Sequence, residues 1–99
     1  MKKCRFYSFM FRYGKSCAVS HSGWTDGVFY YYYVNHGSEL WHAVHPQTGL
    51  GVAYGETRKE AMEKATAAHV MGQIEKAMQQ RGPGMIEAFE KAVQDAESI

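Results

Sequence analysis

The stretch from residue 49 to residue 68 most constrains the fold, because it joins an aromatic, strand-forming half of the chain to an alanine-rich, helical half. Thr57 is the expected N-cap of a helix, and Glu60 follows three residues later. This is the spacing of a capping box, in which a hydroxyl and a carboxylate satisfy backbone N–H groups reciprocally. Small side chains recur along one stripe and would let the helix lie close to a sheet: Ala61, Ala65 and Ala68.

The first half of the chain predicts an antiparallel meander of four to five strands, over residues 3–13, 17–20, 28–35, 40–45 and 50–54. Glycines and prolines separate these runs, with turns expected at 14–16 and a loop over 22–27. The segment 28–35 is the strongest strand. Because side chains alternate along a strand, its tyrosines fall on both faces. A sheet with one wet face would alternate apolar and polar residues, so each face of this strand is expected to be covered or used.

The second half predicts two helices. The first begins at Thr57 and is expected to end at Gly82-Pro83-Gly84, and the second runs from Met85 to about Glu97. The fold class is therefore α+β, with both helices packed on one face of the sheet. A single domain is expected, with residues 1–55 strand-rich and residues 56–99 helical. The apolar face of the first helix moves near Gly72, which favours two different covers: the sheet first, and then either the second helix or another subunit. Together with the two-sided aromatic strand, this shift predicts a homodimer.

Charge is unevenly distributed along a chain whose net charge is only +1 over 99 residues. Residues 1–36 carry five Lys or Arg against one Asp, whereas residues 82–99 carry four acids against one Lys. The small net charge argues against a dedicated duplex-DNA binder. The excess of basic residues in the first half has two interpretations. It either serves solubility, or it forms a face that binds an acidic partner or a phosphate backbone.

The two cysteines, Cys4 and Cys17, set no disulfide framework, and we interpret them as reduced thiols of a cytoplasmic protein. Arg5 and Arg12 interrupt any N-terminal apolar run, so no signal peptide is expected. No segment approaches the roughly 20 apolar residues of a membrane helix.

The sequence contains no strong catalytic or metal motif. His42 and His45 would point to opposite faces of a strand, which does not suit chelation. Cys17 or Ser20 beside His21 lacks a glycine-framed nucleophile turn and an orienting carboxylate. We therefore expect no enzymatic activity, no cofactor and no metal.

The segment Gly-Val-Ala-Tyr-Gly-Glu-Thr-Arg-Lys-Glu-Ala, residues 51–61, resembles the strand-to-helix corner of HicB-type antitoxin domains, over about residues 40–70. The resemblance implies a strand meander before the helix and a protein-binding, antitoxin-like role. The turn Pro-Gln-Thr-Gly-Leu at 46–50 and the aromatic first 36 residues depart from that family. The same corner is similar to the last strand and helix of double-stranded RNA-binding domains, with Arg58-Lys59 as the basic pair, although their leading helix is missing. In size and style the chain is similar to small phage-encoded anti-defence proteins, including anti-CRISPR proteins.

The tyrosine run at 30–33 is the candidate binding surface, because tyrosine gives large contact area at low entropy cost. The alternative is that both faces of this strand are simply core. The residues expected to contact a partner are Phe29, Tyr31, Tyr33, Trp24, Trp41, Arg5 and Arg12. The function predicted is a small inhibitor that binds a larger protein, with nucleic-acid-processing machinery as one candidate partner. The alternative is a single-stranded RNA or DNA binder that stacks bases on these aromatics.

Overall fold

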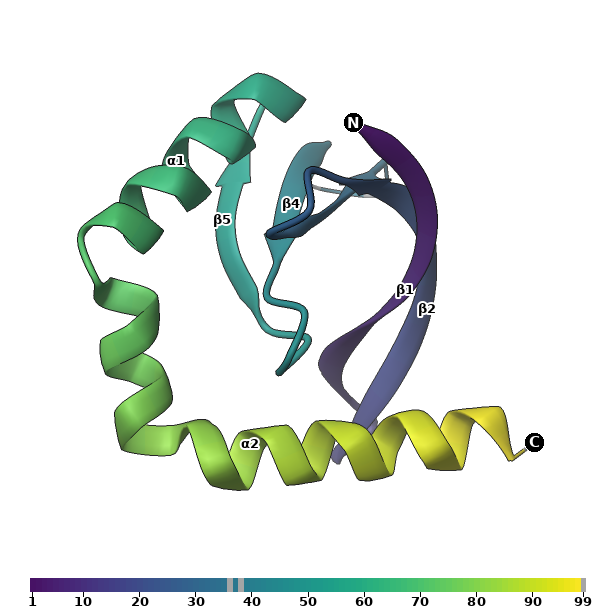
Figure 1. The fold of residues 1–99 in the computed structure, drawn as a ribbon. Coiled ribbons are helices and arrows are strands. Elements are labelled where there is room, and N and C mark those ends of the chain that lie inside the picture. The colour runs from purple at the N-terminus through teal and green to yellow at the C-terminus, as the bar shows by residue number, and fades with distance from the viewer. Residues whose placement is uncertain (36, 38, 99) are drawn as a thin grey trace.

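The computed structural model describes residues 1–35, 37 and 39–98, and it confirms an α+β fold. Five antiparallel strands lie in sequence order in one sheet and are followed by helices α1 and α2 (Figure 1). The strands are β1 (Lys2–Arg12), β2 (Lys15–Thr25), β3 (Tyr30–Val34), β4 (Leu40–Val44) and β5 (Gly51–Gly55). The helices are α1 (Arg58–Val70) and α2 (Gln73–Glu97). Among the described residues, no helix is both long and apolar enough to cross a membrane.

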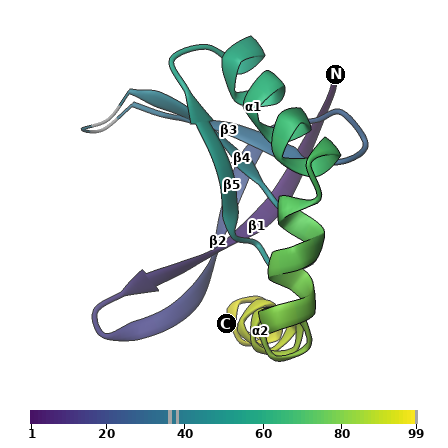
Figure 2. The same ribbon diagram turned by 90° about the vertical axis from the view of Figure 1, so that its left-hand side faces the viewer.

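Strands β1 and β2 form a long hairpin that projects from the rest of the sheet (Figure 2). Its turn is Tyr13-Gly14, with both residues in the left-handed region at φ 52° and 76°. The turn thus lies at 13–14 instead of the expected 14–16, because β2 already begins at Lys15. The loop expected over 22–27 is wrong for residues 22–25, which belong to β2, and is confirmed for residues 26–27. Gly23 is a strand residue for a packing reason: a Cβ there would collide with the carbonyl oxygen of Tyr31.

Both helices pack on one face of the sheet, as predicted. Helix α1 covers β4 and β5, and α2 lies across β1 and β2. The alanines at 61 and 65 are fully buried against Tyr31, Ala43 and Ala53, so the small-residue stripe allows the close approach that was expected of it. Farther along, the Phe89 ring of α2 packs on the Phe9 ring of β1, with centroids 5.7 Å apart.

The opposite face of the sheet, here called the inner face, buries Phe6, Tyr32 and Val44 without a helix over them. The sheet curls so that β1 meets the loop before β5, where the Phe9 N–H donates to the Gly49 carbonyl at 2.8 Å. The two aromatic faces of β3 are thus both occupied. One lies under α1, and the other lies inside the curl.

The helix end expected at residues 82–84 is replaced by a bend. The chain first turns at Gly72, whose φ is 74°, and α2 is then helical through Pro83. The green first part and the yellow-green second part of α2 run in different directions (Figure 1), as is typical of a helix with an internal proline. A proline inside a helix removes one hydrogen bond and costs about 3 kcal/mol. Tertiary contacts at both ends offset this cost, because Ile74 packs against the core and Phe89 is buried on Phe9. The shift of apolar face near Gly72 therefore marks a break between two helices.

Candidate binding surface

Two of the residues expected to contact a partner belong to the core. Tyr31 is 0% exposed and Phe29 is 3% exposed, and both pack with the buried alanines of α1. The expectation that they form an exposed tyrosine platform is wrong, because α1 covers this part of β3.

The Tyr31 hydroxyl has a structural partner, since it donates to Asp26 Oδ2 at 2.8 Å. The other Asp26 oxygen accepts the N–H groups of Val28 and Phe29, each at 2.9 Å. Burial alone would raise the pKa of Asp26, but the hydrogen bonds outweigh it and lower that pKa. Burial, followed by the Asp26 hydrogen bond and charge, raises the pKa of Tyr31. This network orders the loop that leads into β3.

The other aromatic candidates do come together, and with Arg58 they form what we call the indole surface: Trp24, Tyr33, Trp41 and Arg58. The ring centroids of Trp24 and Trp41 are 5.3 Å apart, and those of Tyr33 and Trp41 are 5.6 Å apart. The guanidinium carbon of Arg58 lies 5.8 Å from the Trp24 ring and 5.9 Å from the Trp41 ring. Tyr33 is 46% exposed, and the two indoles are half-buried.

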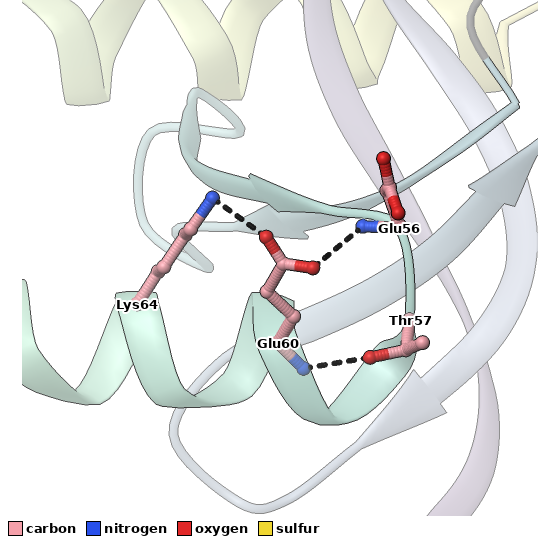
Figure 3. Close-up of polar contacts among 4 residues, drawn as sticks. All are labelled: Glu56, Thr57, Glu60 and Lys64. Carbon is pink, nitrogen blue, oxygen red and sulfur yellow. Dashed lines mark hydrogen bonds and ion pairs between the residues drawn. The ribbon is translucent and has the colours of Figure 1, made fainter.

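The start of α1 places Arg58 over the indoles. The Glu60 N–H donates to the Thr57 hydroxyl at 3.1 Å (Figure 3), which confirms Thr57 as the N-cap. The Glu60 carboxylate accepts the N–H of Glu56 at 3.2 Å, one residue before the expected cap N–H, and pairs with Lys64 at 2.9 Å. Gly55 allows β5 and the start of α1 to approach closely, because a Cβ at this position would lie 2.6 Å from the Ala61 nitrogen.

The basic candidates divide between the two faces. In the β1–β2 register Lys3 is directly opposite Trp24, and Arg5 follows on the same face, where it donates to the Ser20 hydroxyl at 3.2 Å. Arg12 lies on the inner face at the far end of the hairpin. The structure therefore brings Arg5 toward the indole surface and leaves Arg12 outside it. Arg58 was named from the sequence only as part of the basic pair Arg58-Lys59, and it was not predicted to lie over these aromatic rings.

The sequence also missed a polar aromatic cluster on the inner face. Ser8 Oγ and His21 Nε2 are 2.6 Å apart, and the His21 ring stacks on Tyr32 at 3.9 Å. The partner of His21 is thus Ser8 on the neighbouring strand, not Ser20 or Cys17. Tyr32 in turn lies 5.0 Å from the His42 ring, which meets Tyr54 edge-on at 4.6 Å. The Tyr32–His42–Tyr54 row follows from the strand register, which the sequence alone did not provide.

The surroundings of this cluster favour the neutral form of its histidines. Burial lowers the pKa of His21, and the positive charge of Arg12 and the neighbouring His42 ring lower it further. Burial also lowers the pKa of His42. Burial and the neighbouring Tyr54 raise the pKa of Tyr32.

Within the described part of the chain, no three His, Cys, Asp or Glu side chains gather closely enough to hold a metal ion. His42 lies among the inner-face aromatics, whereas His45 Nδ1 is 3.0 Å from the Thr48 hydroxyl. Cys4 and Cys17 are both free thiols.

Comparison of the chain with family models, curated proteins and solved structures finds no match.

Proposed function

We propose that this chain is a non-enzymatic binding protein that inhibits a larger protein by occupying its surface, as antitoxins and anti-defence proteins do. The observation that carries the proposal is the indole surface. Two indole rings and a tyrosine ring are held together on the sheet, and an arginine at the start of α1 covers the two indoles.

Tryptophan, tyrosine and arginine are the residues most enriched among those that dominate protein–protein binding energy. Here the strands and the capped helix fix them before a partner arrives. Binding then costs little side-chain entropy, which favours affinity. Arg58, Lys3 and Arg5 make the neighbourhood cationic, so the partner surface should be apolar at its centre and acidic at its rim.

A homodimer remains part of this proposal. Val70 is 78% exposed and Met71 is 71% exposed at the corner between α1 and α2. Pairing of this corner with a second copy would remove both side chains from water. Light scattering of the purified chain at micromolar concentration should give twice the monomer mass, and the monomer mass alone would contradict the dimer.

The second candidate function is binding of single-stranded RNA or DNA. It is favoured by the position of the Arg58 guanidinium over two indole rings, since bases stack on aromatic side chains while cations follow the phosphates. The dependence of affinity on salt concentration distinguishes the two functions. Affinity for an oligonucleotide falls steeply as salt rises, whereas a protein complex centred on aromatic side chains resists moderate salt.

The test is capture from nuclease-treated bacterial lysate at moderate salt, with mass spectrometry of the retained proteins. Wild-type chain is compared with the double variant Tyr33→Ser/Arg58→Ser, which removes an exposed ring and the covering charge without touching the buried core. The matched control is Tyr13→Asn/Lys59→Ser, because it also removes one exposed ring and one charge but lies outside the indole surface.

We expect one stoichiometric protein with the wild type and with the control, and its loss with the Tyr33→Ser/Arg58→Ser variant. Equal capture by all three chains would refute the indole surface as the site. Retention of nucleic acid alone, removed by nuclease, would favour the second function.

A further inference from the structure

The end of the β1–β2 hairpin, residues 11–16, is here called the hairpin tip, and the proposed function does not use it. Figure 2 shows the hairpin extending beyond the rest of the sheet, with its turn away from both helices. Phe11 is 75% exposed and Tyr13 is 101% exposed, so most of both rings lies in solvent. The tip therefore presents two neighbouring aromatic rings that the core of the chain does not need.

The backbone of Tyr13 is costly for the fold. Its φ of 52° is in the left-handed region, which bulky side chains rarely adopt and in which glycine or asparagine is favoured. Because the side chain is fully exposed, no packing within the described part of the chain offsets this cost. Backbone strain at a residue that the fold does not use indicates a function, so the Tyr13 ring is expected to contact a partner.

The charges directly behind the turn are also unfavourable for the hairpin alone. Arg12 and Lys15 are opposite each other in the β1–β2 register, where like charges repel. The Arg12 guanidinium donates to the Met10 sulfur at 4.0 Å, and among the described residues neither cation forms an ion pair. No Asp or Glu precedes Asp26 in the sequence, so the whole hairpin is free of acids. An anionic partner would offset the repulsion between the two cations.

The arrangement of these groups favours a lipid surface over the groove of a nucleic-acid duplex. Tyr13 is at the turn, and the pair of cations lies one residue behind it on the inner face of the hairpin. At a lipid interface, tyrosine rings lie at headgroup level and cations lie beside the anionic headgroups. A ribbon in a duplex groove needs cations on both faces, because phosphates line both walls. On the outer face the nearest cation of the hairpin is Arg5, roughly 26 Å along the strand from Tyr13.

We propose that the hairpin tip binds the surface of a membrane that contains anionic lipids. The rings of Phe11 and Tyr13 enter the headgroup layer, and the two cations of the tip contact the lipid phosphates. Binding at the interface requires no membrane-spanning helix. The tip lies roughly 30 Å along β2 from Trp24, so it is separate from the indole surface and does not depend on the protein-binding proposal.

The test is co-sedimentation of the full-length chain with two kinds of vesicle at physiological salt. One kind contains phosphatidylcholine alone, and the other contains phosphatidylcholine mixed with anionic phosphatidylglycerol. We expect binding to the anionic vesicles and much weaker binding to the neutral ones. Lys15→Ser should weaken binding to the anionic vesicles about fivefold, because a cation near an anionic surface contributes roughly this factor. Phe11→Ser should weaken it about tenfold, because burial of a phenylalanine ring contributes at least this factor.

Two double variants, each of which loses one exposed ring and one positive charge, localise the binding. Tyr13→Asn/Lys15→Ser changes the tip, and it keeps the fold because asparagine suits the left-handed turn. Tyr33→Ser/Arg58→Ser changes the indole surface and leaves the tip intact. We expect the tip variant to bind anionic vesicles at least about tenfold more weakly than the wild type, and the indole variant to bind as the wild type does. The tip variant should still capture the partner protein, so failure of one proposal is distinguishable from failure of the other.

Equal binding of the wild type and the tip variant, equal binding to neutral and anionic vesicles, or no binding to either would each overturn the proposal. An equal loss with both double variants would show general adsorption of the basic half of the chain, which would also overturn it. A fluorescent DNA duplex tests the other anionic partner. If the tip variant loses affinity for the duplex but not for the vesicles, the tip contacts nucleic acid and the lipid assignment is wrong.

Discussion

Replacing Gly84 by alanine tests whether α2 is continuous across residues 82–84. Gly84 lies inside α2, and a Cβ built on it meets no atom within 4 Å. The substitution therefore adds helix propensity without steric cost. Alanine is more favourable than glycine in a helix interior by about 1 kcal/mol. For a chain of this length that gain corresponds to a rise in Tm of roughly 4–8 °C.

Gly72→Ala is the matched control, because its Cβ also meets nothing within 4 Å but its φ is 74°. Alanine in this left-handed conformation should cost about 1 kcal/mol. Urea denaturation followed by far-UV circular dichroism gives both free energies of unfolding, provided that the m-value is unchanged. Opposite signs are predicted. A loss of stability with Gly84→Ala, or none with Gly72→Ala, would mean that the break lies at residues 82–84.

Three further predictions concern packing, turn strain and pH. Phe89→Ala should lower the free energy of unfolding by about 3 kcal/mol in the same denaturation assay, because it removes the buried ring that packs α2 on Phe9. A loss below about 1 kcal/mol would show that α2 does not pack there. Tyr13→Asn should raise the free energy of unfolding by about 1 kcal/mol, because asparagine tolerates the left-handed φ of 52° that tyrosine adopts in the hairpin turn, and a loss of stability would contradict this turn. Stability should fall as the pH drops below about 6.5: the pKa values of His21 and His42 are lowered in the folded chain, so the unfolded chain binds protons first. His21→Gln should flatten this pH dependence, and an unchanged profile would show that His21 is not buried as a neutral ring.

The fold class was predictable because its signals are local. The Thr57 cap, the alanine stripe and the alternating aromatics each depend on residues close together in sequence, and the structure has all three. The Gly82-Pro83-Gly84 signal predicted a helix end, and the structure has a bend inside α2, because contacts at Ile74 and Phe89 hold the two parts of the helix on the rest of the chain. The extent of β2 was wrong because Gly23 serves a close approach to Tyr31.

The candidate site was only partly predictable. Composition and alternation identified Trp24, Trp41 and Tyr33, but they could not tell how much of this face of β3 lies under α1. Tyr31 is buried there and was misassigned, whereas Tyr33 on the same face is 46% exposed. Arg58 and the inner-face cluster depend on which residues become neighbours once the strands pair and the sheet curls. Which side chains become neighbours depends on the register in which the strands pair, and this register was not predicted from the sequence.

The most direct test of the indole surface uses the fact that the chain has two tryptophans and that both belong to it. The ¹⁵N-labelled chain gives two indole N–H signals, which are recorded before and after addition of the protein captured from lysate. If the indole surface is the binding site, both signals shift or broaden at a stoichiometric amount of partner. If both signals stay unchanged while backbone signals elsewhere shift, the partner binds another face and the central claim is wrong.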